Sequence, residues 1–555
     1  MKEKQIHKVL LFGTYIVVSA LLISGCKTQE SAIKPEPTAQ FTIDPTAQIM
    51  IGPNVPHDVP GGVRLPASVQ SDNTLAAFAW QQFLALSWQS NYDTITHSRG
   101  TPDMNWNYTL PYDSGQSLVW ETFAHRSELR PWGVALSKPF SKAPEYLFKN
   151  TTIKQADGAR FDLFNNLDED NEIGSCSVYN GPGDSTTQYL VIYQAKVNQA
   201  EYDYIKDVFG ATQYDTAGAL ARAADSNAIS IMTHNKPSPN GIDLPAGDNS
   251  VEGIAGEGAI EIKTAFLLVT EENDSALAGF FRTQAIYYTA DYDTGSNKYS
   301  NWQYHNGTFA LLAIHVIHKT KSYPHFIFTS FEHMSLKNMP FQYILLTPSP
   351  PTYPSSNFNP FHPLYPFTAD PATQYGDRHL IERQTGTSPT SNGELYPIPL
   401  YRDVVTEKVH AQLWKLNPKS VWLNYRLIGV QANITERWAP FPIPNLPHFP
   451  PVSPLPAAGP NHFMANHVVE SDAFLGNFFG PGFGTNPFPT GPLGPDSTRN
   501  GDNILFEGKT YNMGGCKGCH GVAQTAFGTD HSFLLDFANK PVRNPDTIIY
   551  HPDED

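Results

Sequence analysis

Near the C-terminus, two cysteines stand three residues apart and a histidine follows directly, in the segment Cys516-Lys517-Gly518-Cys519-His520. The chain has only 4 Cys and 19 His among 555 residues, so chance gives this spacing with a probability of roughly one in a thousand. Cys-x-x-Cys-His is the spacing at which two thiols bond covalently to a c-type haem. It predicts thioether bonds from Cys516 and Cys519, with His520 as the proximal iron ligand. A chain with this motif must fold so that it encloses a porphyrin.

The opposite end has the layout of a bacterial export signal. A start with three lysines precedes an apolar stretch, residues 9–23, which is shorter than a membrane-spanning helix needs to be. The small residues Ser24-Gly25 then stand directly before Cys26 and resemble a lipobox. We expect a lipoprotein signal peptide over residues 1–25 and lipidation of Cys26. Export agrees with the haem motif, and Lys27 favours an outer-membrane lipoprotein that faces the periplasm or the cell surface.

Charge and composition limit the class of partner that the protein is expected to bind. Charged residues make up only 16% of the chain, and the formal net charge is −16. Nucleic-acid binding needs a basic surface, so a nucleic-acid partner is not expected. An acidic surface suits docking to a basic redox protein, although it serves solubility equally well. The partner is therefore expected to be a redox protein or a small-molecule electron donor or acceptor.

The cysteine count excludes an internal disulfide. Lipidation uses Cys26 and haem attachment uses Cys516 and Cys519, which leaves only Cys176. A single remaining cysteine has no intramolecular partner, even in an oxidising compartment.

Composition and hydrophobic periodicity divide the chain into six segments. They are a signal peptide at 1–25, a flexible tether at 26–66, a β-rich body at 67–346, a Pro-rich connection at 347–376, a helical segment with a Pro-rich wrap at 377–460, and a haem-binding region at 461–555.

Within the body, strand patterns dominate. Apolar residues recur at three and four from Asp72 to Trp88, which predicts an amphipathic helix, and two further helices are expected at 198–209 and 402–416. Because the strands do not alternate regularly with helices, the predicted fold class is α+β: a β-rich antiparallel body with a few helices and a C-terminal haem c segment. The expected strands are 189–193, 260–269, 283–289, 309–317, 326–331 and 342–346, with a strand or a further helix at 422–431.

The sequence does not identify the ligand on the distal side of the iron. No Met follows His520, unlike in small c-type cytochromes. His531 is the first candidate, because the apolar run Phe533–Phe537 that follows it is suited to covering a haem, and Met464 is the second. A five-coordinate iron is a third alternative, and it would favour small-ligand chemistry over electron transfer. His462, His467 and His551 are further candidates.

A second set of possible metal ligands lies between residues 315 and 333. It contains three or four imidazoles and one carboxylate within twenty residues, but no known metal-binding spacing. If the segment is a strand, His315 and His318 point to opposite faces, and buried structural histidines are then the simpler interpretation. The set consists of His315, His318, His325, Glu332 and His333.

Several phrases outside the haem motif also look familiar. They are Trp80–Leu86, Val119–Phe123, Ile260–Lys263, Thr329–His333 and Asn466–Glu470. Together with Cys516–His520 they resemble a family of large exported bacterial c-type cytochrome proteins with a single C-terminal haem motif. The resemblance implies haem ligation and supplies no reaction.

The expected function is electron transfer by a lipid-anchored, periplasm-facing monohaem cytochrome with one covalent haem c. Because the body is far larger than one haem requires, two alternatives remain. One is a haem, or haem-plus-metal, oxidoreductase whose body binds a substrate, and the other is a non-redox surface binding module.

Overall fold

The fold is that of a computed structural model, which describes residues 49–59, most of 72–345, and 400–432. The largest gaps inside 72–345 are 130–138, 153–163 and 210–218. The other described residues are 364–366, 374–375, 466, 468, 499–500, 503–506, 509–512, 520, 523, 528–535 and 549–550. The predicted signal peptide, Cys26, Met464, Cys516 and Cys519 lie outside the described residues.

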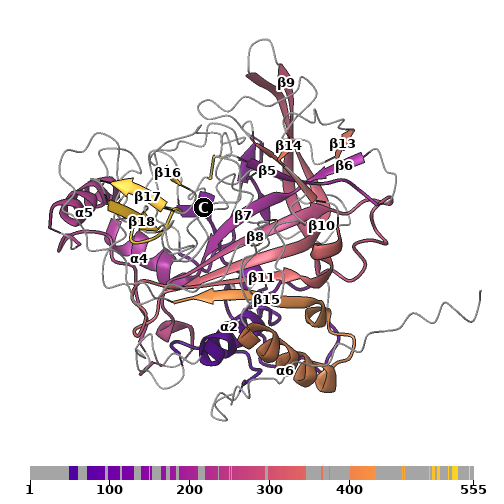
Figure 1. The fold of residues 1–555 in the computed structure, drawn as a ribbon, viewed down its shortest axis with the longest axis horizontal. Helices are drawn as coiled ribbons and strands as arrows, with labels where there is room; N and C mark the ends of the chain where they lie inside the picture. The colour runs from indigo at the N-terminus through magenta and orange to yellow at the C-terminus, as the bar shows by residue number, and fades with distance from the viewer. Residues whose placement is uncertain are drawn as a thin grey trace, which may run out of the picture. The chain divides into compact units, whose positions relative to one another are not determined.

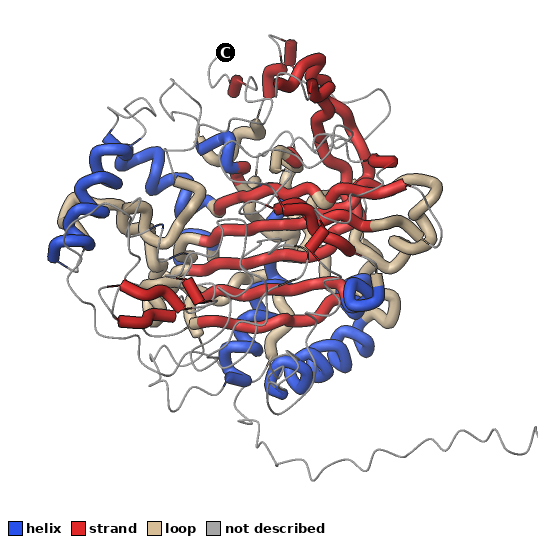
Figure 2. The backbone as a smooth tube through the Cα atoms, turned by 45° about the horizontal axis from the view of Figure 1, so that its top comes forward, coloured by secondary structure: helices blue, strands red, loops and turns tan. Residues whose placement is uncertain are grey.

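One large sheet organises the body (Figures 1 and 2). Every pairing in it is antiparallel except the short contact between β4 and β9, so the predicted β-rich antiparallel body with few helices is confirmed. The strands in spatial order are β1 (Ala124–His125), β7 (Ile192–Val197), β8 (Ile260–Leu268), β10 (Lys298–His318), β11 (Ile327–His333) and β15 (Tyr425–Gln431), with β9 (Arg282–Asp293) on β10 and β4 (Asn166–Leu167) on β9.

Strand β10 has two roles along its 21 residues. Its first part pairs with β9, and its second part lies between β8 and β11. The segment Ala313–His318 is therefore flanked on both sides and has no free edge. Side chains alternate along a strand, so successive residues here face the two surfaces of the sheet.

Three smaller sheets accompany the large one. The run 189–193, predicted as one strand, is divided between β6 and β7, because the chain changes sheets at Val191. The first small sheet contains β13 (Leu364–Pro366), β6 (Thr187–Leu190), β5 (Ser175–Tyr179), β12 (Phe341–Leu345) and β14 (Gln374–Tyr375). The second contains β16 (Arg499–Asn500), β17 (Asn503–Phe506) and β18 (Lys509–Asn512). The third contains β19 (Ile549–Tyr550), β2 (Tyr146–Phe148) and β3 (Thr151–Thr152).

Helix α2 (Asp72–Leu86) covers one surface of the large sheet. The rings of Trp80 and Phe331 have centroids 5.0 Å apart, and those of Phe83 and Phe331 are 4.3 Å apart. Helix α6 (Leu400–Leu416) packs on α2 and on β15, beside them in Figure 1. The sequence predicts an amphipathic α2, but every residue from Asn73 to Leu86 is buried, because α6 covers the side that the sheet does not. We call this surface the helix face.

The other helices lie beyond the ends of strands. The expected helix at 198–209 is α4 (Gln199–Phe209), and Asn198 caps it as predicted: its Oδ1 accepts a hydrogen bond from the Glu201 N–H at 3.3 Å. The sequence analysis missed α5 (Ala219–His234). The short helix α3 (Arg126–Leu129) and the 3-10 turns η1 (Trp120–Thr122), η2 (Ile254–Gly256), η3 (Met334–Asn338) and η6 (Val421–Asn424) complete the described elements.

Two predicted connections contain more structure than expected. Residues 49–59 belong to the predicted flexible tether, yet Ile49, Val55 and Val59 are buried in the core. Asp58 accepts a hydrogen bond from the Ser322 hydroxyl at 2.7 Å. A flexible tether is therefore wrong for these residues, since apolar burial and this bond hold them on the body. The Pro-rich connection at 347–376 contributes β13 and β14.

Within the described part of the chain, no helix is both long and apolar enough to cross a membrane.

Candidate functional site

Of the segment Cys516–His520, His520 is the residue that the structure describes. It lies against the sheet surface opposite the helix face. Its ring centroid is 4.8 Å from that of Phe328 on β11 and 4.9 Å from that of Phe533. Two aromatic rings therefore flank the imidazole, one from the sheet and one from the C-terminal segment. We call this surface of β8, β10 and β11 the C-terminal face. The Tyr193 hydroxyl, on the neighbouring strand β7, likewise donates a hydrogen bond to the main-chain oxygen of Val468, at 2.6 Å.

The hydrogen bond of His520 selects its tautomer. Nδ1 lies 2.7 Å from the main-chain oxygen of His531. A carbonyl oxygen only accepts, so Nδ1 carries the proton and Nε2 keeps its lone pair. Burial lowers the pKa of His520 to about 4, so the ring is neutral at neutral pH. A neutral imidazole, oriented by an Nδ1–H to carbonyl bond, is the form in which histidine ligates a metal. His520 thus fits the role of haem ligand.

The turn that supplies this carbonyl is tightly held. Gly528, Asp530 and His531 all have positive φ, of 70°, 52° and 65°. A Cβ on Gly528 would lie 1.8 Å from the Ala224 carbonyl oxygen of α5, so only glycine fits there. The Asn227 side chain of α5 donates to the Gly528 carbonyl at 2.9 Å. The strained backbone is held by the body, and it fixes the direction of the His531 carbonyl.

An ion pair joins the same turn to the sheet. Lys319, just beyond β10, places Nζ 2.6 Å from Oδ2 of Asp530 and 2.6 Å from Oδ1 of Asp243. Desolvation opposes the charge on Lys319, but the two carboxylates outweigh it and raise the lysine pKa. Asp530 also accepts a hydrogen bond from the Leu244 N–H at 2.7 Å. The position of His520 therefore depends on contacts with residues far away in the sequence.

His531 contacts His520 through its main-chain carbonyl. Its carbonyl holds the Nδ1 edge of His520, whereas an iron ion would bind at the Nε2 edge, and these two edges face different directions. The His531 ring packs instead near Phe326 and His325, with centroids 6.3 and 5.6 Å away. His531 is therefore a positioning residue for the His520 ring, and its role as distal ligand stays a prediction. Met464, the second candidate, remains a prediction.

The second set of possible metal ligands is dispersed, as expected for a strand. The His318 ring stacks on Phe78 at 5.7 Å, on the helix face, and its Nδ1 is 3.2 Å from Oε1 of Gln82. Burial lowers the pKa of His318 to about 3. Glu332 is paired with Arg426 at 2.7 Å. Among the described residues, no three His, Cys, Asp or Glu side chains are grouped so that they could hold a metal ion.

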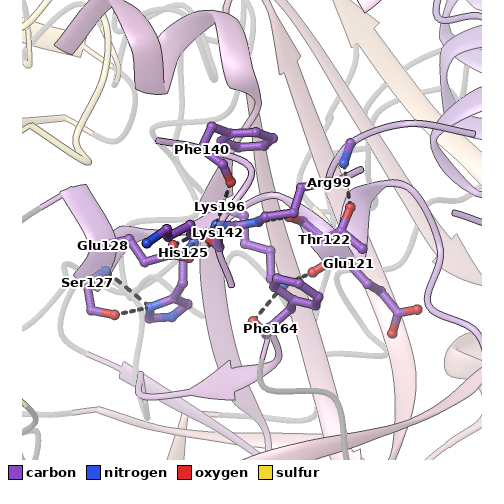
Figure 3. A network of polar contacts seen from close by, with 11 residues as sticks. Arg99, Glu121, Thr122, His125, Ser127, Glu128, Phe140, Lys142, Phe164 and Lys196 are labelled. Atoms are coloured by element: carbon purple, nitrogen blue, oxygen red, sulfur yellow. Dashed lines mark hydrogen bonds and ion pairs between the residues drawn. The ribbon is translucent and has the colours of Figure 1, made fainter. Parts of the chain in front are cut away.

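A separate polar network lies at β1 and α3 (Figure 3). The Arg99 guanidinium bonds both oxygens of Glu128, at 2.9 and 3.0 Å, with no exposure of either side chain. Lys196 donates to the main-chain oxygens of Glu121 and Phe164. The Lys196 bonds join Glu121 and Phe164 to β7, and the Arg99 bonds join Arg99 to α3. A buried pair whose hydrogen bonds are made in this way holds segments in place.

His125 in this network has the bonding pattern of a catalytic base. Its Nδ1 is 2.7 Å from the Ser127 hydroxyl and its Nε2 is 3.2 Å from Asp168. Burial opposes ionisation of Asp168, but Arg126 and His125 outweigh it and lower the pKa of Asp168 to about 2.

A second copy of the local arrangement argues for a structural role. His333 and Ser335 are also two residues apart, and Nδ1 of His333 is 2.7 Å from the Ser335 hydroxyl. In each pair the serine N–H donates to the histidine Nδ1, at 3.1 and 3.2 Å. The histidine caps a helical turn in both places, so this His-x-Ser geometry is a capping motif rather than a catalytic pair.

No family model, no curated protein and no solved structure matches this chain. Function is therefore inferred from the chain's own residues.

Proposed function

We propose that this protein is a monohaem c-type cytochrome that transfers electrons. The observation that carries the proposal is the Cys-x-x-Cys-His motif together with the state of its histidine. His520 is neutral and has its Nδ1 bonded to a carbonyl, so Nε2 is free of that bond and suited to iron. When bound, the haem would supply reversible one-electron exchange.

The chain's residues have distinct roles in this proposal. Cys516 and Cys519 form the thioether bonds, and His520 is the proximal ligand. Phe328 and Phe533 flank the imidazole on two sides. The His531 carbonyl, held through Asp530 and Lys319, keeps the ring in one orientation. A rigidly held ligand reduces the reorganisation that accompanies electron transfer.

The proposed location follows from the N-terminal sequence. Residues 1–25 export the chain, and a lipid on Cys26 anchors it to the outer membrane, facing the periplasm or the cell surface. The net charge of −16 favours a basic redox protein as partner, because opposite charges steer encounters.

A haem stain tests the proposal directly. The full chain is co-expressed with the machinery that attaches c-type haems, and a denaturing gel is stained for haem peroxidase activity. The wild-type chain should give a band that survives denaturation. The double variant Cys516→Ala, Cys519→Ala should lose the band, because no thiol remains at the motif.

The matched control is Cys176→Ala, which removes the cysteine of β5 and leaves the motif intact. This variant should stain like the wild type. If the wild-type band is absent while a known c-type cytochrome stains under the same conditions, the chain carries no covalent haem and the proposal is wrong.

A further inference from the structure

Strand β10 carries two histidines that face opposite surfaces of the sheet. His318 points to the helix face, where it packs under α2 against Phe78 and Gln82. His315 is three residues earlier, so its side chain points to the C-terminal face. The same strand thus sends one imidazole into the aromatic core and the other to the surface on which His520 lies.

The strand register brings His315 close to His520. His315 pairs with Ser330 of β11, and the next pair on the same face joins Ile317 and Phe328. Diagonal neighbours of this kind are about 7–8 Å apart, within reach of long side chains. Phe328 is in ring contact with His520. His315 and Lys263 are both close enough to His520 to interact with it electrostatically.

A row of polar side chains crosses the sheet at the position of His315. Lys263 of β8 and Ser330 of β11 are the two residues paired with His315. Ser330 is only 2% exposed, and its hydroxyl has no hydrogen-bond partner among the described residues. Buried hydroxyls are normally satisfied, so Ser330 places an unpartnered polar group beside His315.

We propose that His315 is the sixth ligand of the haem iron. The inference rests on the proposed function, because it requires a haem on His520. It assigns to β10 the distal ligand that the sequence leaves open, and it explains why a large β-rich body accompanies a single haem motif. Two imidazole ligands favour electron transfer over small-ligand chemistry, because no iron position stays open. They also give a lower reduction potential than a His–Met pair.

The test compares the two histidines of β10 in the full-length holoprotein. His315→Gln removes the proposed ligand, and His318→Gln is the matched control from the opposite face. Each variant is examined by the haem stain, by absorption spectra of both oxidation states, and by addition of carbon monoxide to the reduced protein. Circular dichroism verifies that both variants fold.

We expect the wild type to be low-spin and to bind carbon monoxide poorly. His315→Gln should become high-spin and bind carbon monoxide readily, and added imidazole should restore the low-spin spectrum. His318→Gln should keep the wild-type spectrum. As a second variant, His315→Met should gain a sulfur-to-iron charge-transfer band, which no structural role of His315 explains.

Three results would overturn the inference. The first is a sulfur-to-iron band in the wild type, which would assign the ligand to a methionine such as Met464. The second is a wild type that binds carbon monoxide freely. The third is a His315→Gln spectrum identical to that of the wild type. In each case a retained haem stain leaves the cytochrome proposal standing. Loss of the stain from the wild type would instead refute the cytochrome proposal itself.

Discussion

The two faces of the large sheet solve different physical problems. On the helix face, aromatic rings from α2, β11 and η6 interlock: Phe83 stacks on Phe331 at 4.3 Å and meets the edge of Trp422 at 5.3 Å. Gln82 there finds a polar partner within the same layer, the Thr329 hydroxyl at 3.1 Å. Apolar burial is the main source of stability on this face.

The C-terminal face buries charge instead. Lys319, Asp530 and Glu261 lie within it, and Glu201 of α4 adds another carboxyl nearby. Burial, followed by the neighbouring Glu261 and Asp530, raises the pKa of Glu201 well above its ordinary value. Desolvating several charges costs stability unless each is paired. The comparison indicates that the helix face holds the sheet together, while the C-terminal face gives up some stability to hold His520 in position.

The largest expected effect is on the helix face. Phe83→Ala removes a fully buried ring that contacts the sheet and η6. Truncation of a buried phenylalanine costs about 3–5 kcal/mol. Denaturant unfolding should show this loss, while the remaining folded protein keeps the wild-type haem spectrum. A changed spectrum with unchanged stability would reverse the roles assigned to the two faces.

The second effect distinguishes a buried carboxylate from an exposed one, both of which pair with Lys319. Asp530 and Asp243 each lie 2.6 Å from Nζ of Lys319, but their side chains are 7% and 84% exposed. Asp530→Asn should cost about 1.5–3 kcal/mol, the range for a buried hydrogen bond to a charged group. Asp243→Asn should cost less than about 1 kcal/mol, because exposed pairs contribute little.

Denaturant unfolding of both asparagine variants makes this comparison. The Asp530 variant should also shift the haem spectrum, because Asp530 precedes the residue whose carbonyl orients His520. Equal losses of stability in the two variants would show that burial does not set the strength of this ion pair.

The smallest expected effect, counted per pH unit, is a pH dependence that originates on the helix face. Burial lowers the pKa of His318 to about 3, whereas the unfolded chain titrates near 6.5. Between these values the unfolded state binds the extra proton, so stability is lost as the pH falls from about 6.5 toward 3. One such group contributes about 1.4 kcal/mol per pH unit in this window.

Denaturant unfolding at a series of pH values checks this prediction. His318→Gln should reduce the slope by that amount without abolishing it, because burial also lowers the pKa of His333 to about 4. An unchanged slope in the variant would mean that the buried environment of His318 does not disfavour its protonation.

Local patterns in the sequence predicted much of the framework. The nearly continuous apolar run of 309–317 identified the core of β10, and the three-four spacing after Asp72 identified α2. Helix α5 was missed, because its central Asp225-Ser226-Asn227 run favours caps and turns over helix interiors. The amphipathic prediction for α2 was wrong, since local spacing does not reveal that α6 returns to cover the outer side.

By itself, the sequence determined the haem motif, the strand-rich body and the opposite orientations of His315 and His318. Each of these depends on residues only a few positions apart. Only the tertiary structure decided which surface of β10 faces His520, that the His531 carbonyl holds the His520 ring, and that Lys319 pairs with Asp530, 211 residues away. The physical reason is that such contacts depend on where the chain returns to the sheet. Burial then decides which charges form ion pairs. No short-range sequence pattern encodes which residues become buried.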